Sequence, residues 1–188
     1  LRAEDSSILN QNRPNRMPEA VFQQIFTNGG IPELMAACTD SAKFSVDSRL
    51  RALSRRLLEV APSPQTYEVE MAKANALIAC KAPESAQAVL ANFSLPLGLE
   101  PQRKKWLILS WQAAHAALDH LGASSALRRL ANGNLGALEK EQLVVGFDQD
   151  GSPLTRRALD LLAEHEIVMG KWDEAAEVLL AGRTKGVI

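Results

Sequence analysis

The residues best suited to acid–base or metal chemistry are three histidines, His115, His120 and His165. Two ligands on one helix face need a spacing of three or four residues, and no pair of these histidines has it. Glu164 and Glu166 flank His165, but consecutive residues point in different directions around a helix. We therefore interpret this segment as a solvated helical strip, in preference to a proton relay or a metal site.

No other catalytic constellation is recognisable. The sequence has no serine in a nucleophile elbow, no phosphate-binding glycine loop and no cysteine pair at metal-ligand spacing. We therefore expect no enzymatic activity, no cofactor and no metal. Cys38 and Cys80 lie in apolar helical patterns, so we interpret them as reduced, buried side chains, with a disulfide between them as the alternative.

One acidic loop has, at Gly151, the glycine of a calcium-binding EF-hand loop. Such a loop also needs oxygen ligands at its first and twelfth positions, which are Gly146 and Arg157 here. These two decisive ligands are absent. We interpret the segment as a turn, with Ser152 capping a helix that follows Pro153.

Basic residues gather in clusters that could contact phosphate groups. A basic surface is predicted on the helix that begins at Val46, with Arg49, Arg51, Arg55 and Arg56. Smaller clusters occupy positions 103–105 and 128–129. No aromatic residues alternate with them, and the net charge is only −1. Solvated helix faces are therefore the favoured interpretation.

The composition of the 188-residue chain favours closely packed helices, with 46% apolar but only 5% aromatic residues. No stretch approaches the roughly 20 continuous apolar residues of a membrane helix. Residues 1–16 lack the apolar core of a signal peptide. We therefore expect no membrane insertion and a cytoplasmic location. Because the chain starts at Leu1, we expect a processed form or an excised piece of a longer protein.

Residues 1–16 are polar and aperiodic, which predicts a flexible lead-in to a single all-helical domain over residues 17–188. Apolar periodicity and proline positions predict about ten helices and no convincing strand. Their expected ranges are 18–26, 32–38, 46–61, 64–80, 86–93, 101–121, 123–130, 135–144 and a hairpin at 156–182, with a polar connector at 39–45. The predicted fold class is all-α, an irregular stack of antiparallel helical hairpins.

The clearest hairpin is the last, Arg156 to Gly182. Gly170 ends its first helix, because glycine reaches positive φ without a Cβ clash. Looser hairpins are predicted at 67–93 and 108–131, with turns at Lys81 and Gly122. Since no single hairpin can bury its own apolar face, the units are expected to stack.

The last hairpin resembles a tetratricopeptide repeat, and the matching residues are Leu162, Ala163, Gly170, Trp172 and Ala175. In that family small residues let the two helices cross closely, and the aromatic residue after the turn fills the gap between them.

The two upstream hairpins match less well. The hairpin at 67–93 keeps Ala74, Leu77 and Ala86, and the hairpin at 108–131 keeps Trp111, Leu118 and Gly122, with Ala126 one residue early. The expected turns are about 41 and 48 residues apart, whereas the family repeats every 34 residues. An irregular α-solenoid is therefore expected.

The resemblance implies a protein-binding groove lined by the first helix of each hairpin. The implied residues are Glu68, Met71, Asn75 and Ile78 in one hairpin and Arg157, Asp160, Glu164 and Ile167 in another. Some family members clamp a C-terminal carboxylate in this groove. Asn75 matches one clamp position, but Met71 stands where a lysine is needed, so that ligand is not expected.

The leading hypothesis is a non-catalytic helical scaffold that mediates protein–protein interaction through the groove or the arginine-rich helix. A helical accessory or regulatory region of a larger enzyme is second. A nucleic-acid-binding helical module is the least favoured.

Overall fold

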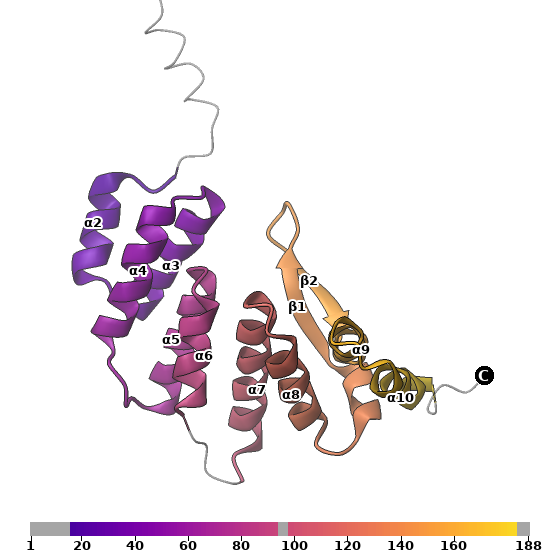
Figure 1. Ribbon diagram of the computed structural model, residues 1–188. Helices are drawn as coiled ribbons and strands as arrows, with labels where there is room; N and C mark the ends of the chain where they lie inside the picture. Colours follow the sequence, from indigo (N-terminus) through magenta and orange to yellow (C-terminus); the bar gives the residue numbers. More distant parts are fainter. Residues whose placement is uncertain (1–15, 94–97, 184–188) are drawn as a thin grey trace, which may run out of the picture.

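The computed structural model describes residues 16–93 and 98–183. Within these ranges the chain is mostly helical with one two-stranded sheet, as Figure 1 shows, which confirms the prediction of a mostly helical chain. The helices are α2 (Glu19–Asn28), α3 (Ile31–Lys43), α4 (Asp47–Val60), α5 (Tyr67–Ala79), α6 (Pro83–Ala91), α7 (Glu100–Ala116), α8 (His120–Ala131), the 3-10 helix η1 (Leu135–Lys140), α9 (Ala158–Val168) and α10 (Trp172–Arg183). The predicted flexible lead-in, apart from Arg16, lies outside the described residues.

The sheet corrects the expectation of an all-helical chain without strands. Strand β1 (Gln142–Phe147) pairs antiparallel with β2 (Pro153–Arg157), where a helix had been expected up to residue 144. The turn between them is held by Asp148, whose Oδ1 accepts from the amides of Asp150 and Ser152, both at 2.9 Å. Ser152 therefore caps no helix, and Pro153 begins a strand.

Four helical hairpins share one type of turn. Each turn has a residue with positive φ, and these residues are Ser45 (55°), Lys81 (59°), Leu118 (57°) and Gly170 (74°). The amide that follows each of them donates to the carbonyl five residues earlier, at 2.8, 2.9, 2.9 and 2.8 Å respectively. This bond satisfies a carbonyl that the end of the preceding helix would otherwise leave unpaired.

The position of the third turn corrects the predicted end of α7. The chain turns at Leu118, four residues before the glycine that was expected to end the preceding helix, and α8 begins at His120. Asp119 caps α8 by accepting a hydrogen bond from the Gly122 amide at 2.9 Å. A Cβ at position 122 would collide with this carboxylate, so the glycine serves the cap and not the turn. The four turn residues observed in the structure are 36, 37 and 52 residues apart along the chain, and the longest interval contains η1, β1 and β2.

Positions equivalent with respect to the four turns are buried in all of the hairpins. Positions are counted from the residue with positive φ in each turn. The buried residues seven positions before it are Cys38, Ala74, Trp111 and Ala163. Those five positions after it are Leu50, Ala86, Ala123 and Ala175, and those eight positions after it are Leu53, Val89, Ala126 and Val178. Trp172, in contrast, is 65% exposed, so it does not fill the gap between α9 and α10 as the resemblance implied.

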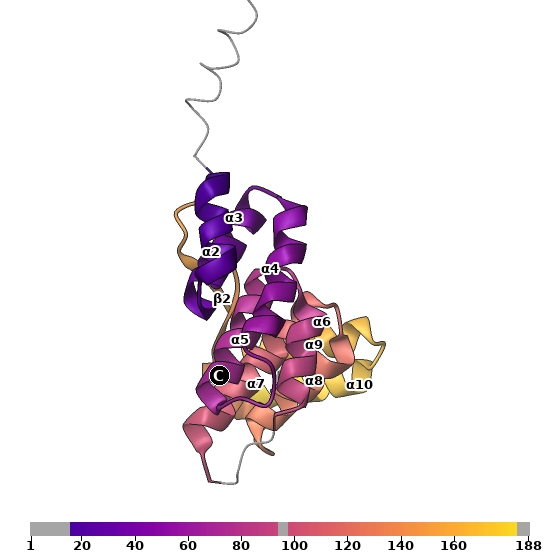
Figure 2. The same ribbon diagram turned by 90° about the vertical axis from the view of Figure 1, so that its left-hand side faces the viewer.

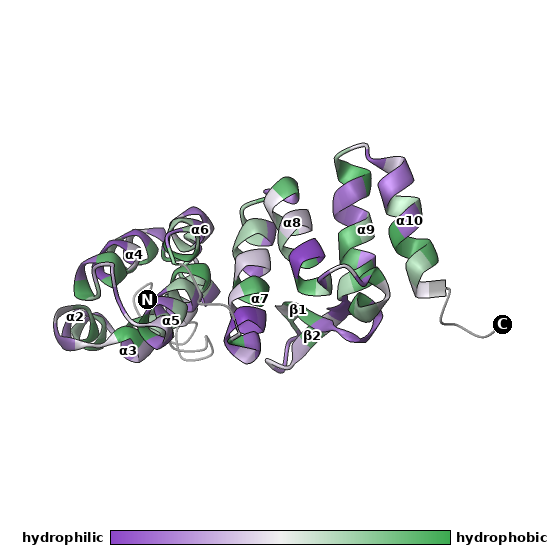
Figure 3. Cartoon of the chain, turned by 90° about the horizontal axis from the view of Figure 1, so that it is seen from below, coloured by the Kyte–Doolittle hydropathy of each residue, from purple (hydrophilic) through white to green (hydrophobic). Residues whose placement is uncertain are grey.

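The hairpins follow one another from α2–α4 at one end to α9–α10 at the other (Figure 1), and Figure 2 views the molecule from the α2–α4 end. In Figure 3, α3, α5, α7 and the β hairpin lie along one side, and α4, α6 and α8 lie along the other. Helix α7 joins two cores: Leu109 and Ala113 pack with α2–α6, whereas Trp111 and Ala114 pack with the following elements.

Helix α3 corrects two further predictions. It continues through the expected polar connector to Lys43, and the hydroxyl of Thr39 is satisfied within the helix by donating to Met35 O at 3.1 Å. Cys38 in α3 and Cys80 at the end of α5 form a disulfide, so they are not the reduced side chains that were expected. This bond links the first two hairpins.

Candidate functional site

A hollow of about 460 Å³ lies between the first helices of three hairpins and strand β1; we name it the inner hollow. Its lining residues are Met35, Thr39 and Ala42 from α3, Asn75, Ile78, Ala79 and Lys81 from α5 and its turn, Trp111, Gln112, His115 and Ala116 from α7, and Val144, Val145, Gly146 and Phe147 from β1. On each helix these residues recur at helical spacing, which places them on one face. The hollow is thus built by the elements that the hairpin turns hold side by side.

The walls of the inner hollow are mostly apolar. Phe147 is 68% exposed, so its ring adds apolar surface that a ligand can reach. Among the described residues that line the inner hollow, Lys81 is the only Lys, Arg, Asp or Glu. Such a surface favours an apolar ligand with hydrogen-bonding groups over a polyanion.

Strand β1 contributes one edge to this hollow. Within the described residues its only strand partner is β2, which covers the other edge. The register shifts between Val144 and Gly146, as in a β-bulge. Beyond the shift, the Asp148 amide donates to Ser152 O at 2.9 Å, so strand alternation directs the backbone groups of Phe147 away from β2.

Behind the hollow, the three histidines converge with a tryptophan. Trp111 Nε1 donates to His165 Nε2 at 3.1 Å, and the rings of Trp111 and His115 stack with centroids 4.8 Å apart. Because Nε2 accepts this bond, a neutral His165 carries its proton on Nδ1. That nitrogen lies 3.0 Å from His120 Nδ1, which accepts the bond.

This cluster corrects the interpretation of residues 164–166 as a solvated strip. Glu164 is exposed and pairs with Arg156, but His165 is only 4% exposed and Glu166 is buried. The spacing rule considered ligands on one helix, whereas these histidines come from α7, α8 and α9. Only the packing of separate helices brings the rings together.

Burial lowers the pKa of two of these histidines. The pKa of His165 is lowered to about 4, mainly by burial and also by the nearby His115 and His120, against an opposing effect of Glu164 and Glu166. Burial also lowers the pKa of His115, whose Nδ1 is buried without a hydrogen-bond partner. Across the described part of the chain, no group of three or more His, Cys, Asp or Glu residues is placed to hold a metal ion. Burial and packing therefore favour the neutral form of His115 and His165.

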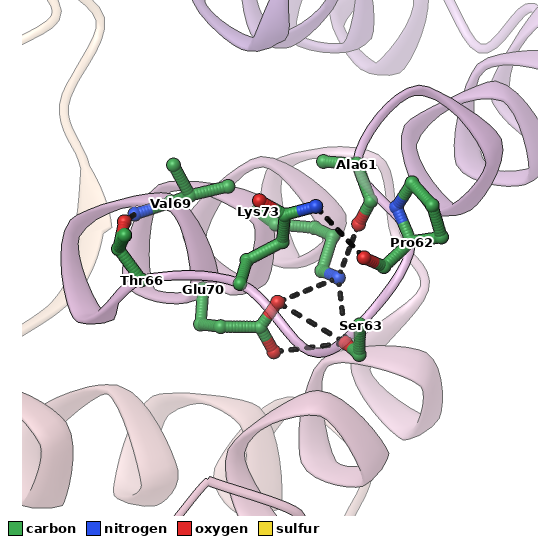
Figure 4. Close-up of polar contacts among 8 residues, drawn as sticks. Ala61, Pro62, Ser63, Thr66, Val69, Glu70 and Lys73 are labelled. Atoms are coloured by element: carbon green, nitrogen blue, oxygen red, sulfur yellow. Dashed lines mark hydrogen bonds and ion pairs between the residues drawn. The ribbon is translucent and has the colours of Figure 1, made fainter.

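A second buried polar cluster joins α5 to the loop before it (Figure 4). Lys73 Nζ donates to Ala61 O at 2.6 Å, Ser63 Oγ at 2.9 Å and Glu70 Oε1 at 2.9 Å. Three acceptors match the three donors of an ammonium group. Ser63 Oγ in turn donates to Glu70, at 3.0 Å from Oε2. A lysine that activates a serine nucleophile must be neutral, so this arrangement is better suited to anchoring the loop than to catalysis.

The sequence-predicted groove residues do not come together at one site. Asn75 and Ile78 line the inner hollow. Met71 is fully buried in the core beneath it, so its prediction as a groove residue is wrong. Glu68 is exposed but does not line the hollow.

The groove residues predicted in the last hairpin also lie outside the inner hollow. Arg157 pairs with Asp160 and Glu139, and Glu164 pairs with Arg156. Ile167 is partly exposed on α9. The β1 residues of the hollow were missed because residues 135–144 were predicted as a helix and the residues from Gly146 as a turn-rich loop. The adjacent Val144 and Val145 were the available signal for a strand.

The predicted basic surface on α4 is smaller than expected. Arg49 is only 6% exposed; it pairs with Glu19 at 2.7 Å and its guanidinium lies 4.6 Å from the centre of the Phe22 ring. Arg56 donates to the carbonyl of Phe26 at 3.1 Å. Arg51 and Arg55 remain exposed. Arg49 is therefore a packing residue that fixes α2 against α4.

No helix among the described residues combines the length and the apolar character needed to cross a membrane. Comparisons with protein-family models, with curated proteins and with solved structures find no match to this chain.

Proposed function

We propose that this protein is a non-catalytic helical scaffold that binds an extended segment of another protein in the inner hollow. The observation that carries the proposal is the combination of an apolar hollow with an edge of strand β1 that has no strand partner among the described residues. An extended segment can pair its backbone with such an edge, while its side chains enter the hollow.

The size of the hollow is consistent with such a segment. A strand advances about 3.4 Å per residue, lies about 4.8 Å from its neighbour and packs about 10 Å from the next layer. Each residue therefore occupies roughly 160 Å³. The hollow of about 460 Å³ has room for about three residues.

The segment that fits best is apolar and uncharged or weakly acidic. Met35, Ile78 and Phe147 offer apolar contacts, and Asn75 and Gln112 offer amide groups. The lining provides a single ammonium group, on Lys81. A nucleic acid would need several cations to neutralise its phosphates, so the inner hollow is poorly suited to it.

For the scaffold itself we propose a tetratricopeptide-like stack with an insertion. Three of the four turns are 36 and 37 residues apart, close to the family's 34, and equivalent positions around all four turns are buried. The third interval is longer because η1 and the β hairpin lie within it. In this proposal the insertion completes the binding site by supplying β1.

We also propose that the protein acts in an oxidising compartment, instead of the cytoplasm expected from the sequence. The support is the Cys38–Cys80 disulfide, a bond that persists mainly outside reducing compartments. Alkylation of the protein isolated from its own cells, followed by mass spectrometry, tests this. Modification of both cysteines without prior reduction would contradict it.

Selection of random peptides on the immobilised protein tests the binding function. Selected peptides should protect the Phe147 amide from hydrogen exchange, and Phe147→Asp should weaken their binding about tenfold or more. Leu154→Asp is the matched control, because Leu154 is 48% exposed on β2 and does not line the hollow.

Equal loss of binding in both variants would contradict the site, and so would selected peptides that bind as helices. A selection that yields no peptide would contradict the proposed function itself.

A further inference from the structure

A second hollow, of about 550 Å³, lies where the third and fourth hairpins meet; we name it the basic hollow. Arg103 near the start of α7, Arg128 and Arg129 near the end of α8, and Lys171 after the turn of the last hairpin all line it. None of its lining residues lines the inner hollow. It is therefore a separate surface.

The antiparallel arrangement of α7 and α8 assembles this hollow. It brings two basic clusters together that are about 25 residues apart in the sequence, and Arg103 Nη2 donates to Arg129 O at 3.2 Å. The Arg129 guanidinium lies 4.9 Å from the centre of the Trp106 ring. This cation–π contact orients the guanidinium without neutralising its charge.

Three cations in the basic hollow have no anionic partner. Among the described residues, no carboxylate lies within ion-pair distance of Arg103, Arg129 or Lys171. Arg128 is different, since its Nη2 pairs with Glu166 Oε1 at 3.0 Å. The hollow therefore offers unpaired positive charge to a ligand.

Glu166, in contrast, has a carboxylate oxygen that needs a hydrogen-bond donor. Its Oε1 accepts from Ser124 Oγ at 2.8 Å and from Arg128 Nε at 3.1 Å. Its Oε2 is buried without any hydrogen-bond partner, although Glu166 lines the hollow. An unsatisfied buried carboxylate oxygen favours a ligand that supplies an N–H or O–H donor.

We infer that the basic hollow binds an acidic segment of a partner protein. Aspartate or glutamate carboxylates of the segment pair with Arg103, Arg129 and Lys171, and a main-chain N–H of the same segment donates to Glu166 Oε2. This ligand supplies both the anions and the donor that the hollow lacks.

A nucleic acid fits less well. The buried Glu166 Oε2 needs a hydrogen-bond donor, which a peptide main chain supplies and a phosphodiester group does not. The nearby aromatic face of Trp106 is already covered by Arg129, so no ring is free there for base stacking.

Fluorescence anisotropy with a labelled peptide of alternating aspartate and glycine tests the inference on the intact chain at low salt. Arg129→Gln combined with Lys171→Gln should weaken binding about tenfold, because two charge-assisted contacts are lost. Arg51→Gln combined with Arg55→Gln is the matched control, since both residues are exposed, carry the same charge and lie outside the basic hollow. This control should change the affinity less than about twofold.

Three outcomes would overturn the inference. These are no measurable binding of the peptide, equal weakening in both double variants, and tighter binding of a single-stranded oligonucleotide through the same arginine and lysine. Phe147→Asp separates this site from the proposed peptide-binding function, because it should leave acidic-peptide binding unchanged. The asparagine–glycine counterpart of the peptide should not bind.

Discussion

Acidification should destabilise this protein through His165. Its pKa is about 4 in the folded protein and 6.5 when exposed, so the folded state binds a proton less readily than the unfolded state. Stability from this residue is complete above pH 6.5 and is lost as the pH falls towards 4. The difference is worth about 3 kcal/mol, at about 1.4 kcal/mol per pKa unit. About 2 kcal/mol of it is lost by pH 5.

The hydrogen bonds of His165 disfavour its protonation, as its burial does. Protonated His165 would carry a hydrogen on Nε2, where the Trp111 indole already donates. It would also add positive charge beside His115 and His120. Protonation of His165 weakens contacts that join α7, α8 and α9, so the last two hairpins should separate first.

The assay is urea unfolding, followed by far-UV circular dichroism, at several pH values between 7 and 4. His165→Gln is the comparison, because its amide oxygen can accept from Trp111 and does not titrate. The wild type should lose about 3 kcal/mol more than this variant on acidification. Losses equal within about 0.5 kcal/mol would refute the reasoning, and so would an NMR titration that finds the His165 ring near pH 6.5.

Three further substitutions test elements of the scaffold by urea unfolding. Cys80→Ser removes a disulfide that closes 42 residues and should cost about 4 kcal/mol; a midpoint unaffected by reductant in the wild type would contradict the bond. Lys73→Met leaves Glu70 buried without its cation and should cost about 3–5 kcal/mol, whereas adding Glu70→Leu should restore most of the loss; no restoration would contradict the pairing. Leu118→Gly should add about 1 kcal/mol by relieving positive φ, and destabilisation would place the turn elsewhere.

Local sequence signals were sufficient for most helices. The spacing of Leu50, Leu53 and Leu57 predicted α4, and Gly170 predicted the last turn, because helix periodicity and a glycine's access to positive φ are properties of short segments. The third turn was misplaced because Leu118, not the nearby Gly122, takes the left-handed conformation. The Asp119 side chain, which caps α8 through the Gly122 amide, outweighed the local preference for a turn at the glycine.

The candidate sites depend on tertiary structure. The histidine cluster, the disulfide and both hollows join residues from separate helices, and no spacing rule within one helix can reveal them. The same holds for Met71, which periodicity placed in a groove and packing placed in the core.

Sequence alone therefore determined that this chain forms amphipathic helices paired by short turns, since apolar spacing and turn chemistry act within about ten residues. Tertiary structure decided which faces meet. It placed β1 against the first helices, buried Arg49 and His165, and gathered distant arginines at one hollow. The physical reason is that burial and charge pairing depend on distances in space between segments that are far apart along the chain.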